Sequence, residues 1–227
     1  MMKGLRKNSE GDFNMADPKR EYLRRKGEVL VRNLQRRHFG ACYCDTKEEA
    51  LEKALQMIRK EDTIGWGGAM SAHQIGLVDT LNNQGYHTLD RSRCKTPEET
   101  EQCMKDCLFA DVFLTGANAI SLTGEMVNID GCGNRVAAIV YGPRKVIVIA
   151  GMNKVRDTLE DAVKRARTIA APINKQRFAD HVTPCQVTGT CEDCTSEACI
   201  CNQILITRHC RPAGRIQFIL VGQDLGF

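Results

Sequence analysis

The residues with the clearest capacity for chemistry are cysteines grouped near the C-terminus. Of the 12 cysteines in this chain of 227 residues, six lie between Cys185 and Cys210. Thiolates are soft ligands, and four of them suit tetrahedral zinc or an iron–sulfur cluster. The spacing Cys-x5-Cys-x2-Cys-x6-Cys therefore predicts a metal site with the ligands Cys185, Cys191, Cys194 and Cys201.

The spacing of these cysteines does not identify the metal. It differs from the common ferredoxin spacing and lacks the second Cys-x-x-Cys pair of a zinc ribbon, so iron–sulfur and zinc both stay open. Cys199, Cys210 and His209 are further possible ligands. The alternative is a set of free or packed thiols, which we expect for most of the cysteines between Cys42 and Cys132.

A second candidate site is a glycine-rich turn between a predicted strand and a predicted helix, Gly65-Trp66-Gly67-Gly68-Ala69-Met70-Ser71. Gly67 and Gly68 let the backbone approach a ligand, and the N–H groups of a first helical turn favour a phosphate or carboxylate. Ser71 and Gln74 have the spacing of a capping box. The run lacks the third glycine of a dinucleotide fingerprint, so we identify no nucleotide motif. The alternative is a turn with a structural role alone.

A third group of polar residues is dense enough to form a binding site for a small anion. Its members are Asn118, Asn128, Asp130, Asn134 and Arg135. On a strand Asn128 and Asp130 point to the same face, and Asn134 is expected to cap the following helix. Asp130 is the candidate general base. The alternative is that these side chains satisfy the backbone of turns.

Asn153 and Lys154 complete the candidate anion site. They directly follow the continuous apolar run Val146–Ala150, which is typical of a buried parallel strand. Ligands of open α/β sheets bind at the C-terminal ends of strands. We therefore expect Asn153 and Lys154 to contact an anion there.

The elements that must position these residues alternate between strand and helix. Pro18, after Asp17, begins a basic helix that runs to about His38. The pattern predicts further helices over 46–59, 71–83, 97–110, 135–141 and 157–170, the last ended by Pro172. It predicts strands over 40–44, 63–66, 87–89, 111–114, 146–150 and 216–221, and a hairpin of 120–122 with 126–129. This order predicts an α/β fold with a largely parallel sheet.

Composition excludes several classes of protein. Aromatic residues make up 5% of the chain and the net charge is +4, which argues against a general nucleic-acid binder. No apolar run approaches the length of a membrane span, and the N-terminus lacks the apolar core of a signal peptide. We therefore expect a cytoplasmic protein, whose thiols stay reduced.

Taken together, these motifs resemble the lactate-utilisation (LUD) domain family, once known as a domain of unknown function. The resemblance extends from about Asp17 to Phe227. The motifs that carry it are Gly65–Gly68, Gly116–Ile120, Val127–Ala138, Tyr141–Pro143, Gly151–Lys154, Ala171–Asn174, Thr183–Cys185, Cys191–Cys194, Ile200–Asn202 and Leu225–Phe227. The family's glycine motif usually continues Ser-x-Thr with a following Glu, and this chain has Ala69, Ser71 and His73 there.

The resemblance implies a Rossmann-like sheet similar to that of sugar-phosphate isomerases and coenzyme A transferases. It also implies a relation to subunits of an iron–sulfur complex that oxidises L-lactate to pyruvate. Cys199 stands where relatives often carry a basic residue, so it is left out of the metal set. The expected organisation is an extension over 1–16, the LUD-type domain over 17–180, the Cys-rich segment over 181–212 and a final strand of the same domain over 213–227.

Three functions follow as hypotheses. The first is a redox-associated protein of organic-acid metabolism, which binds a small anionic metabolite and works with a redox partner subunit. The second is an isomerase or transferase for a phosphorylated or coenzyme-A-linked metabolite, with Asp130 as base. The third is a non-catalytic subunit that docks through its basic N-terminal helix and is braced by zinc. In each case we expect a homo-oligomer.

Overall fold

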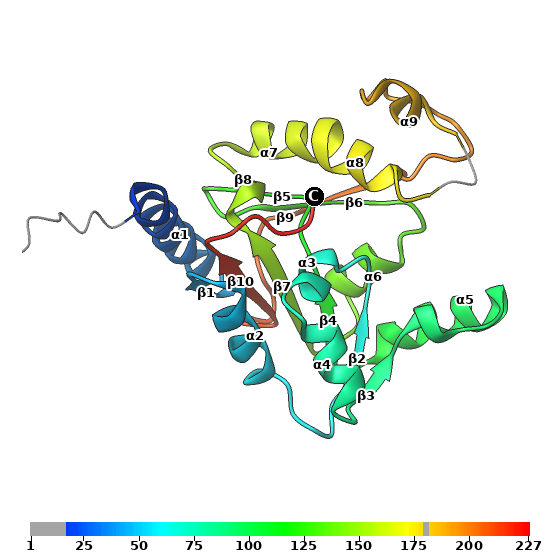
Figure 1. The fold of residues 1–227 in the computed structure, drawn as a ribbon, viewed down its shortest axis with the longest axis horizontal. Helices are drawn as coiled ribbons and strands as arrows, with labels where there is room; N and C mark the ends of the chain where they lie inside the picture. Colours follow the sequence, from blue (N-terminus) through cyan, green and yellow to red (C-terminus); the bar gives the residue numbers. More distant parts are fainter. Residues whose placement is uncertain (1–16, 179–181) are drawn as a thin grey trace, which may run out of the picture.

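Two β-sheets organise the part of the chain that the computed structural model describes, residues 17–178 and 182–227. One sheet has six strands and the other has four, and the chain ends between them (Figure 1). The extension predicted over residues 1–16 lies outside the described residues. None of the helices in the described ranges has the length and apolar character needed to cross a bilayer.

The six-stranded sheet is parallel throughout, as the alternation of strands and helices predicts. Its strands, in spatial order, are β1 (Gly40–Cys44), β10 (Ile216–Val221), β7 (Lys145–Gly151), β4 (Val112–Thr115), β2 (Thr63–Trp66) and β3 (His87–Leu89). The last strand in the sequence is thus inserted between β1 and β7. A strand in that position is covered on both faces, which explains the continuous apolar run Phe218–Val221.

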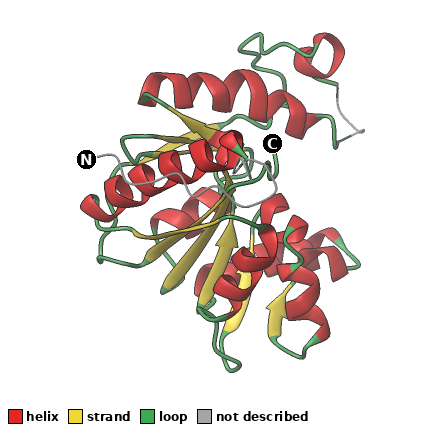
Figure 2. Ribbon diagram, turned by 60° about the vertical axis from the view of Figure 1, so that its left-hand side comes forward, coloured by secondary structure: helices red, strands yellow, loops and turns green. Residues whose placement is uncertain are grey.

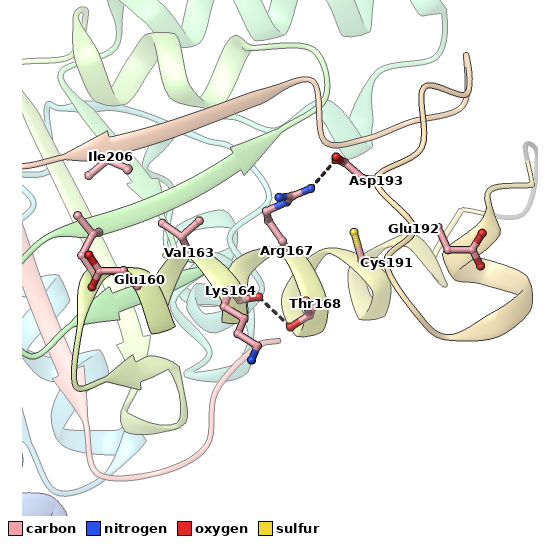
Figure 3. A pocket seen from close by; sticks show the side chains of 10 residues that line it. Glu160, Val163, Lys164, Arg167, Thr168, Cys191, Glu192, Asp193 and Ile206 are labelled. Atoms are coloured by element: carbon pink, nitrogen blue, oxygen red, sulfur yellow. Dashed lines mark hydrogen bonds and ion pairs between the residues drawn. The ribbon is translucent and has the colours of Figure 1, made fainter.

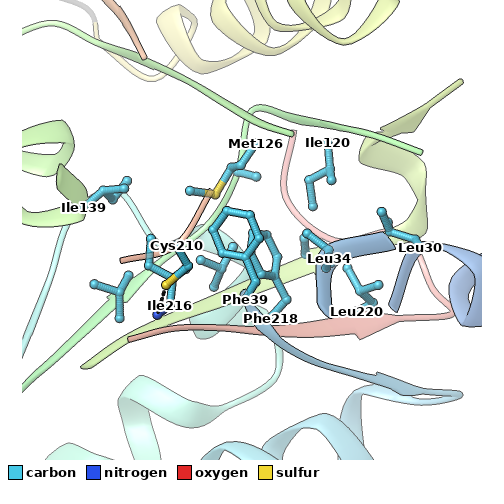
Figure 4. Packing of buried hydrophobic residues seen from close by; sticks show 14 of the residues in the cluster. Leu30, Leu34, Phe39, Ile120, Met126, Ile139, Cys210, Ile216, Phe218 and Leu220 are labelled. Atoms are coloured by element: carbon cyan, nitrogen blue, oxygen red, sulfur yellow. Dashed lines mark hydrogen bonds between the residues drawn. The ribbon is translucent and has the colours of Figure 1, made fainter. Parts of the chain in front are cut away.

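Helices cover both faces of this sheet (Figure 2). On one face lie α1 (Pro18–Arg36) and α6 (Asn134–Val140), over a core that includes Val146, Val148 and Phe218. Within it, Phe39 packs edge-to-face on Phe218 with ring centroids 5.3 Å apart (Figure 4). On the other face Ile147 and Ile149 pack against α2 (Lys47–Leu55), α3 (Met70–Gln74) and α4 (Leu77–Asn83). Successive side chains of β7 thus point to opposite faces of the sheet, as the two-residue period of a strand requires.

The four-stranded sheet has the order β8 (Val155–Arg156), β5 (Ala119–Ser121), β6 (Met126–Asp130) and β9 (Gln203–Thr207). Pairing of β5 with β6 is antiparallel, so the predicted hairpin is confirmed. A helical run covers the sheet and consists of α7 (Leu159–Arg165), the π-helical turn η4 (Ala166–Ala170) and α8 (Ala171–Lys175). β9 was not predicted. It follows the cysteines and pairs with β6 along an edge where Ile204 and Ile206 stay exposed.

Three predicted helices differ from those in the structure. The helix predicted over 46–59 ends at Leu55. The helix predicted over 71–83 is divided into α3 and α4, because Gly76 adopts a left-handed conformation with φ 79°. The helix predicted to stop at Pro172 continues to Lys175, because a π-helical turn precedes the proline and Pro172 stands in the first turn of α8. The remaining helical segments are η1 (Arg91–Arg93), α5 (Pro97–Asp106), η2 (Cys107–Phe109), η3 (Met152–Lys154) and α9 (Pro184–Thr188).

Thr158 caps the helix that covers the second sheet, and its removal should weaken the fold. The Thr158 Oγ1 atom accepts a hydrogen bond from the Asp161 N–H at 3.1 Å. We expect Thr158→Ala to lower the free energy of unfolding by about 1 kcal/mol, measured by urea denaturation. Thr168→Ala, in the interior of the same helical run, should have a smaller effect. Equal losses in the two variants would contradict the capping role.

Candidate functional site

A cavity of about 530 Å³ lies where the loops that follow β2, β4, β6 and β7 meet the end of α8 and the C-terminal residues. Seven of the ten residues predicted to form an anion site line it, namely Gly68, Ser71, Asn118, Asp130, Asn134, Arg135 and Lys154. These loops leave the C-terminal ends of the strands, which is where ligands of parallel sheets bind. The structure therefore brings three separate sequence motifs to one cavity.

The other three predicted residues, Gly67, Asn128 and Asn153, support the wall of the cavity. A side chain at Gly67 would place its Cβ 2.8 Å from Cδ of Arg135, so only glycine leaves room for that arginine. Asn128 is fully buried and donates from Nδ2 to the Gly116 carbonyl at 3.0 Å. Asn153 accepts from the Leu225 N–H at 3.2 Å, which ties the end of the chain to the site.

Lys154 is the most unusual group of the cavity. Its side chain follows β7 and is only 4% exposed, and Nζ donates to Oγ of Ser71 at 3.3 Å. Burial, together with the positive charges of Arg165 and Arg135, lowers the pKa of Lys154 to about 7. Within residues 17–178 and 182–227 no carboxylate lies within 4.0 Å of this ammonium.

Arg135 and Arg165 surround Lys154 and are themselves anchored mainly by oxygen atoms without charge. Arg135 donates to Oδ1 of Asn118 at 3.0 Å and to the Ile129 carbonyl, and burial lowers its pKa. Arg165 donates to the carbonyls of Asn118 and Asn153 and to a main-chain oxygen of Phe227, and burial lowers its pKa to about 10. Positive charge is thus concentrated beside the cavity with little compensation.

Asp130 is the one acidic side chain among the described residues that line the cavity. Its Oδ2 accepts from the Val136 N–H at 3.1 Å and lies 3.7 Å from Nε of Arg135. It therefore caps α6 and balances part of the charge of Arg135. The proposed role of Asp130 as a general base stays a prediction.

Both predicted caps are wrong at this site. Ala69 precedes α3 and Gly133, with φ 86°, precedes α6, and neither Ser71 nor Asn134 caps its helix. Ser71 accepts from Lys154 instead, and Gln74 accepts from the Gly226 N–H at 2.6 Å. At this turn the contacts are therefore made by the side chains of Ser71 and Gln74. The helix α3 has five residues and cannot supply a strong dipole at its N-terminus.

Comparison with known proteins identifies the family of this chain. Residues 27–221 match the family model described as the LUD domain. This chain belongs to the LUD domain family. A similar solved structure is a DUF162 family protein from Deinococcus radiodurans, with 14% identity, a TM-score of 0.48, and coverage of 89% of this chain and 97% of that one. No curated protein matches.

The four cysteines predicted as ligands in this LUD domain lie in the segment between α8 and β9. Cys185, Cys191, Cys194 and Cys201 are partly exposed and carry free thiols. In the described ranges no three His, Cys, Asp or Glu side chains are grouped closely enough to hold a metal ion. The metal site therefore stays a prediction.

The thiols are nevertheless close enough to influence one another. Burial, together with nearby Cys199, Cys191 and Cys185, raises the pKa of Cys201 to about 12. Sγ of Cys199 accepts from the Cys201 N–H at 3.3 Å, so the cysteine left out of the predicted set is an immediate neighbour of a predicted ligand. A set of thiols that converges on Cys201 fits a soft metal in its chemistry.

A second hollow of about 830 Å³ borders this Cys-rich segment (Figure 3). It lies between α7–η4 and the loop with Cys191, and Arg167 pairs with Asp193 across it. Val163 and Ile206 supply apolar surface. It is a groove on the opposite side of the helical run from Lys154, and it contains none of the predicted anion-binding residues.

Four residues at or behind this cavity were not predicted as site residues. Arg91 and Arg177 line it from segments without a recognisable motif, Phe227 lines it from the motif Leu225–Phe227, and Arg165 lies behind Lys154. The sequence carries a signal for Arg165 too, because this residue shares the buried stripe of its helix with Ala162 and Ala166. An arginine on the apolar face of a helix predicts a buried contact.

Proposed function

We propose that this LUD domain binds a small organic acid in the 530 Å³ cavity and takes part in redox metabolism of such acids. The observation that supports this most is the buried ammonium of Lys154, which faces the cavity without a neighbouring carboxylate in the described ranges. Burial of an unpaired charge is costly, and a bound carboxylate would offset that cost. Arg135, Arg91 and Arg177 add to the attraction for an anion.

The redox part of the proposal depends on the Cys-rich segment. Cys185, Cys191, Cys194 and Cys201 would hold an iron–sulfur cluster, which would supply one-electron transfer to a partner subunit, or zinc, which would brace the segment. Metal analysis and an absorption spectrum of anaerobically purified protein distinguish the two. Iron with sulfide supports the redox role, stoichiometric zinc supports bracing, and a metal-free protein contradicts both.

Removal of the Arg135 guanidinium should weaken acid binding. We expect Arg135→Gln to raise the Kd for lactate or pyruvate by about 10- to 100-fold, because a charge-assisted hydrogen bond is lost. Isothermal titration calorimetry measures this, and Arg135→Lys, which keeps the charge, should lose less. Arg144, 77% exposed and outside the cavity, provides the control Arg144→Gln. Equal affinity in Arg135→Gln and the wild type would contradict the proposed anion site.

A further inference from the structure

Contacts with two separate segments of the chain hold the amine of Lys154 in place. Nζ has Ser71 Oγ as its hydrogen-bond partner in the described chain, and both side chains line the cavity. The backbone closes over it: a Cβ on Gly226, which has φ 62°, would lie 2.7 Å from Nζ. Lys154 is therefore fixed between α3 and the C-terminal residues, with its amine at the cavity wall.

We propose that Lys154 forms an imine with a 2-oxo acid whose carboxylate is held beside Arg135. This rests on the proposed binding of an organic acid and names its class, since the acid must carry a carbonyl next to the carboxylate. A carboxylate at Arg135 would leave the adjacent carbonyl carbon in the cavity that Lys154 also lines, and the two cations are close enough for Arg135 to lower the pKa of Lys154. A lysine desolvated beside other cations is a known way to obtain an amine nucleophile near neutral pH.

The charges that act on Lys154 come from two helices, α7 and α6. Arg165 of α7 and Arg135 of α6 oppose its protonation, Ser71 of α3 contributes only a hydroxyl, and Asp130 lies against Arg135. With a pKa of about 7, roughly half of the amine is neutral at pH 7, against on the order of one part in 10³ for a lysine near 10.5. Only the neutral form attacks a carbonyl.

The step balances without an oxidant or a reductant. The Nζ lone pair forms a bond to the carbonyl carbon, and the C=O π pair moves to oxygen. One Nζ proton passes to that oxygen, for which the Ser71 hydroxyl at 3.3 Å is placed to relay it. A second proton transfer releases water and leaves C=N. The product is an imine that withdraws electrons from the neighbouring carbons.

Reductive trapping tests this proposal without knowledge of the full reaction. The full-length protein is incubated with pyruvate and sodium borohydride, digested, and mapped by mass spectrometry. We expect the reduced adduct on Lys154 to exceed that on any exposed lysine by at least about tenfold at pH 7. Acetone, which lacks the carboxylate, should label Lys154 less. The rate should rise with pH up to about 7 and then level, because the amine becomes neutral there.

Two variants and one further ligand complete the design. Lys154→Arg should lose the adduct, and Lys47→Arg, at a side chain 52% exposed, should keep it. Calorimetry with lactate, which has no carbonyl, measures binding alone. If pyruvate and lactate bind but Lys154 stays unlabelled, or labelling is equal among exposed lysines, the imine is overturned and the proposed acid site stands. If neither acid binds, the proposed function itself fails.

Discussion

Lys154→Met should make the protein more stable while it removes the reactive amine. The lysine is 4% exposed and its pKa falls from the usual 10.5 to about 7, so its charged form is disfavoured in the fold. This shift corresponds to a penalty of about 3–5 kcal/mol at pH values below the folded pKa. Methionine fills a similar volume without a charge, and we expect a gain of that order in the free energy of unfolding at pH 6.

The pH dependence of the free energy of unfolding distinguishes removal of the buried charge from better packing as the cause of the gain. Between about pH 7 and 10.5 the unfolded chain binds the proton of Lys154 and the folded chain does not, so stability of the wild type rises with pH there. The advantage of Lys154→Met should therefore shrink from pH 6 to pH 9 in urea denaturation. Lys47→Met, at an exposed lysine, should run parallel to the wild type. A constant difference between Lys154→Met and the wild type would contradict the charge explanation.

A stabilising substitution at Lys154 would mean that the chain retains a costly charge for a reason other than folding. Natural proteins often give up stability at the site where they act. Here the cost is concentrated on one ammonium beside Arg135 and Arg165. The group whose charge is costly in the fold is thus the same amine that lines the cavity.

The sequence predicts the position of the candidate site better than its internal contacts. Lys154 and Ser71 follow β7 and β2 of the parallel sheet, whose geometry is enough to predict that they meet, whereas Arg135 follows β6 of the second sheet. Which group each side chain binds depends on differences of a few tenths of an ångström in the distances between segments that are far apart in the sequence. Capping rules assign Ser71 and Asn134 to their own helices, whereas in the fold α3 begins one residue earlier and Gly133 precedes α6.

The fold itself follows from local patterns where apolar runs are continuous. β7 and β10 are evident because parallel strands buried on both faces need no polar alternation. β9 is missed because it stands at an edge, where its partner β6 decides its pairing. The helix end predicted at Pro172 is wrong because the fold accommodates one missing N–H after a π-helical turn.

Phe218→Ala should cause one of the largest losses of stability of any single substitution in this chain. The ring is fully buried on β10, which lies between β1 and β7, and it packs edge-to-face on Phe39 at 5.3 Å. Removal of a buried aromatic ring costs about 3–5 kcal/mol, because it loses transfer free energy and leaves a cavity. We expect a lower urea midpoint with an unchanged slope.

The same substitution tests whether two buried thiols become exposed together with the sheet. Cys44 ends β1, the neighbour of β10, and Cys210 precedes β10 in the sequence. In Phe218→Ala, loss of β10 should expose the buried thiols Cys44 and Cys210 to a thiol reagent at the same urea concentration at which the sheet unfolds. Phe109→Ala, at a ring 89% exposed, is the matched control and should change neither measurement. Reaction of these thiols well before the sheet unfolds would contradict a single cooperative unit, because a strand with a partner on each side cannot leave the sheet without breaking both pairings.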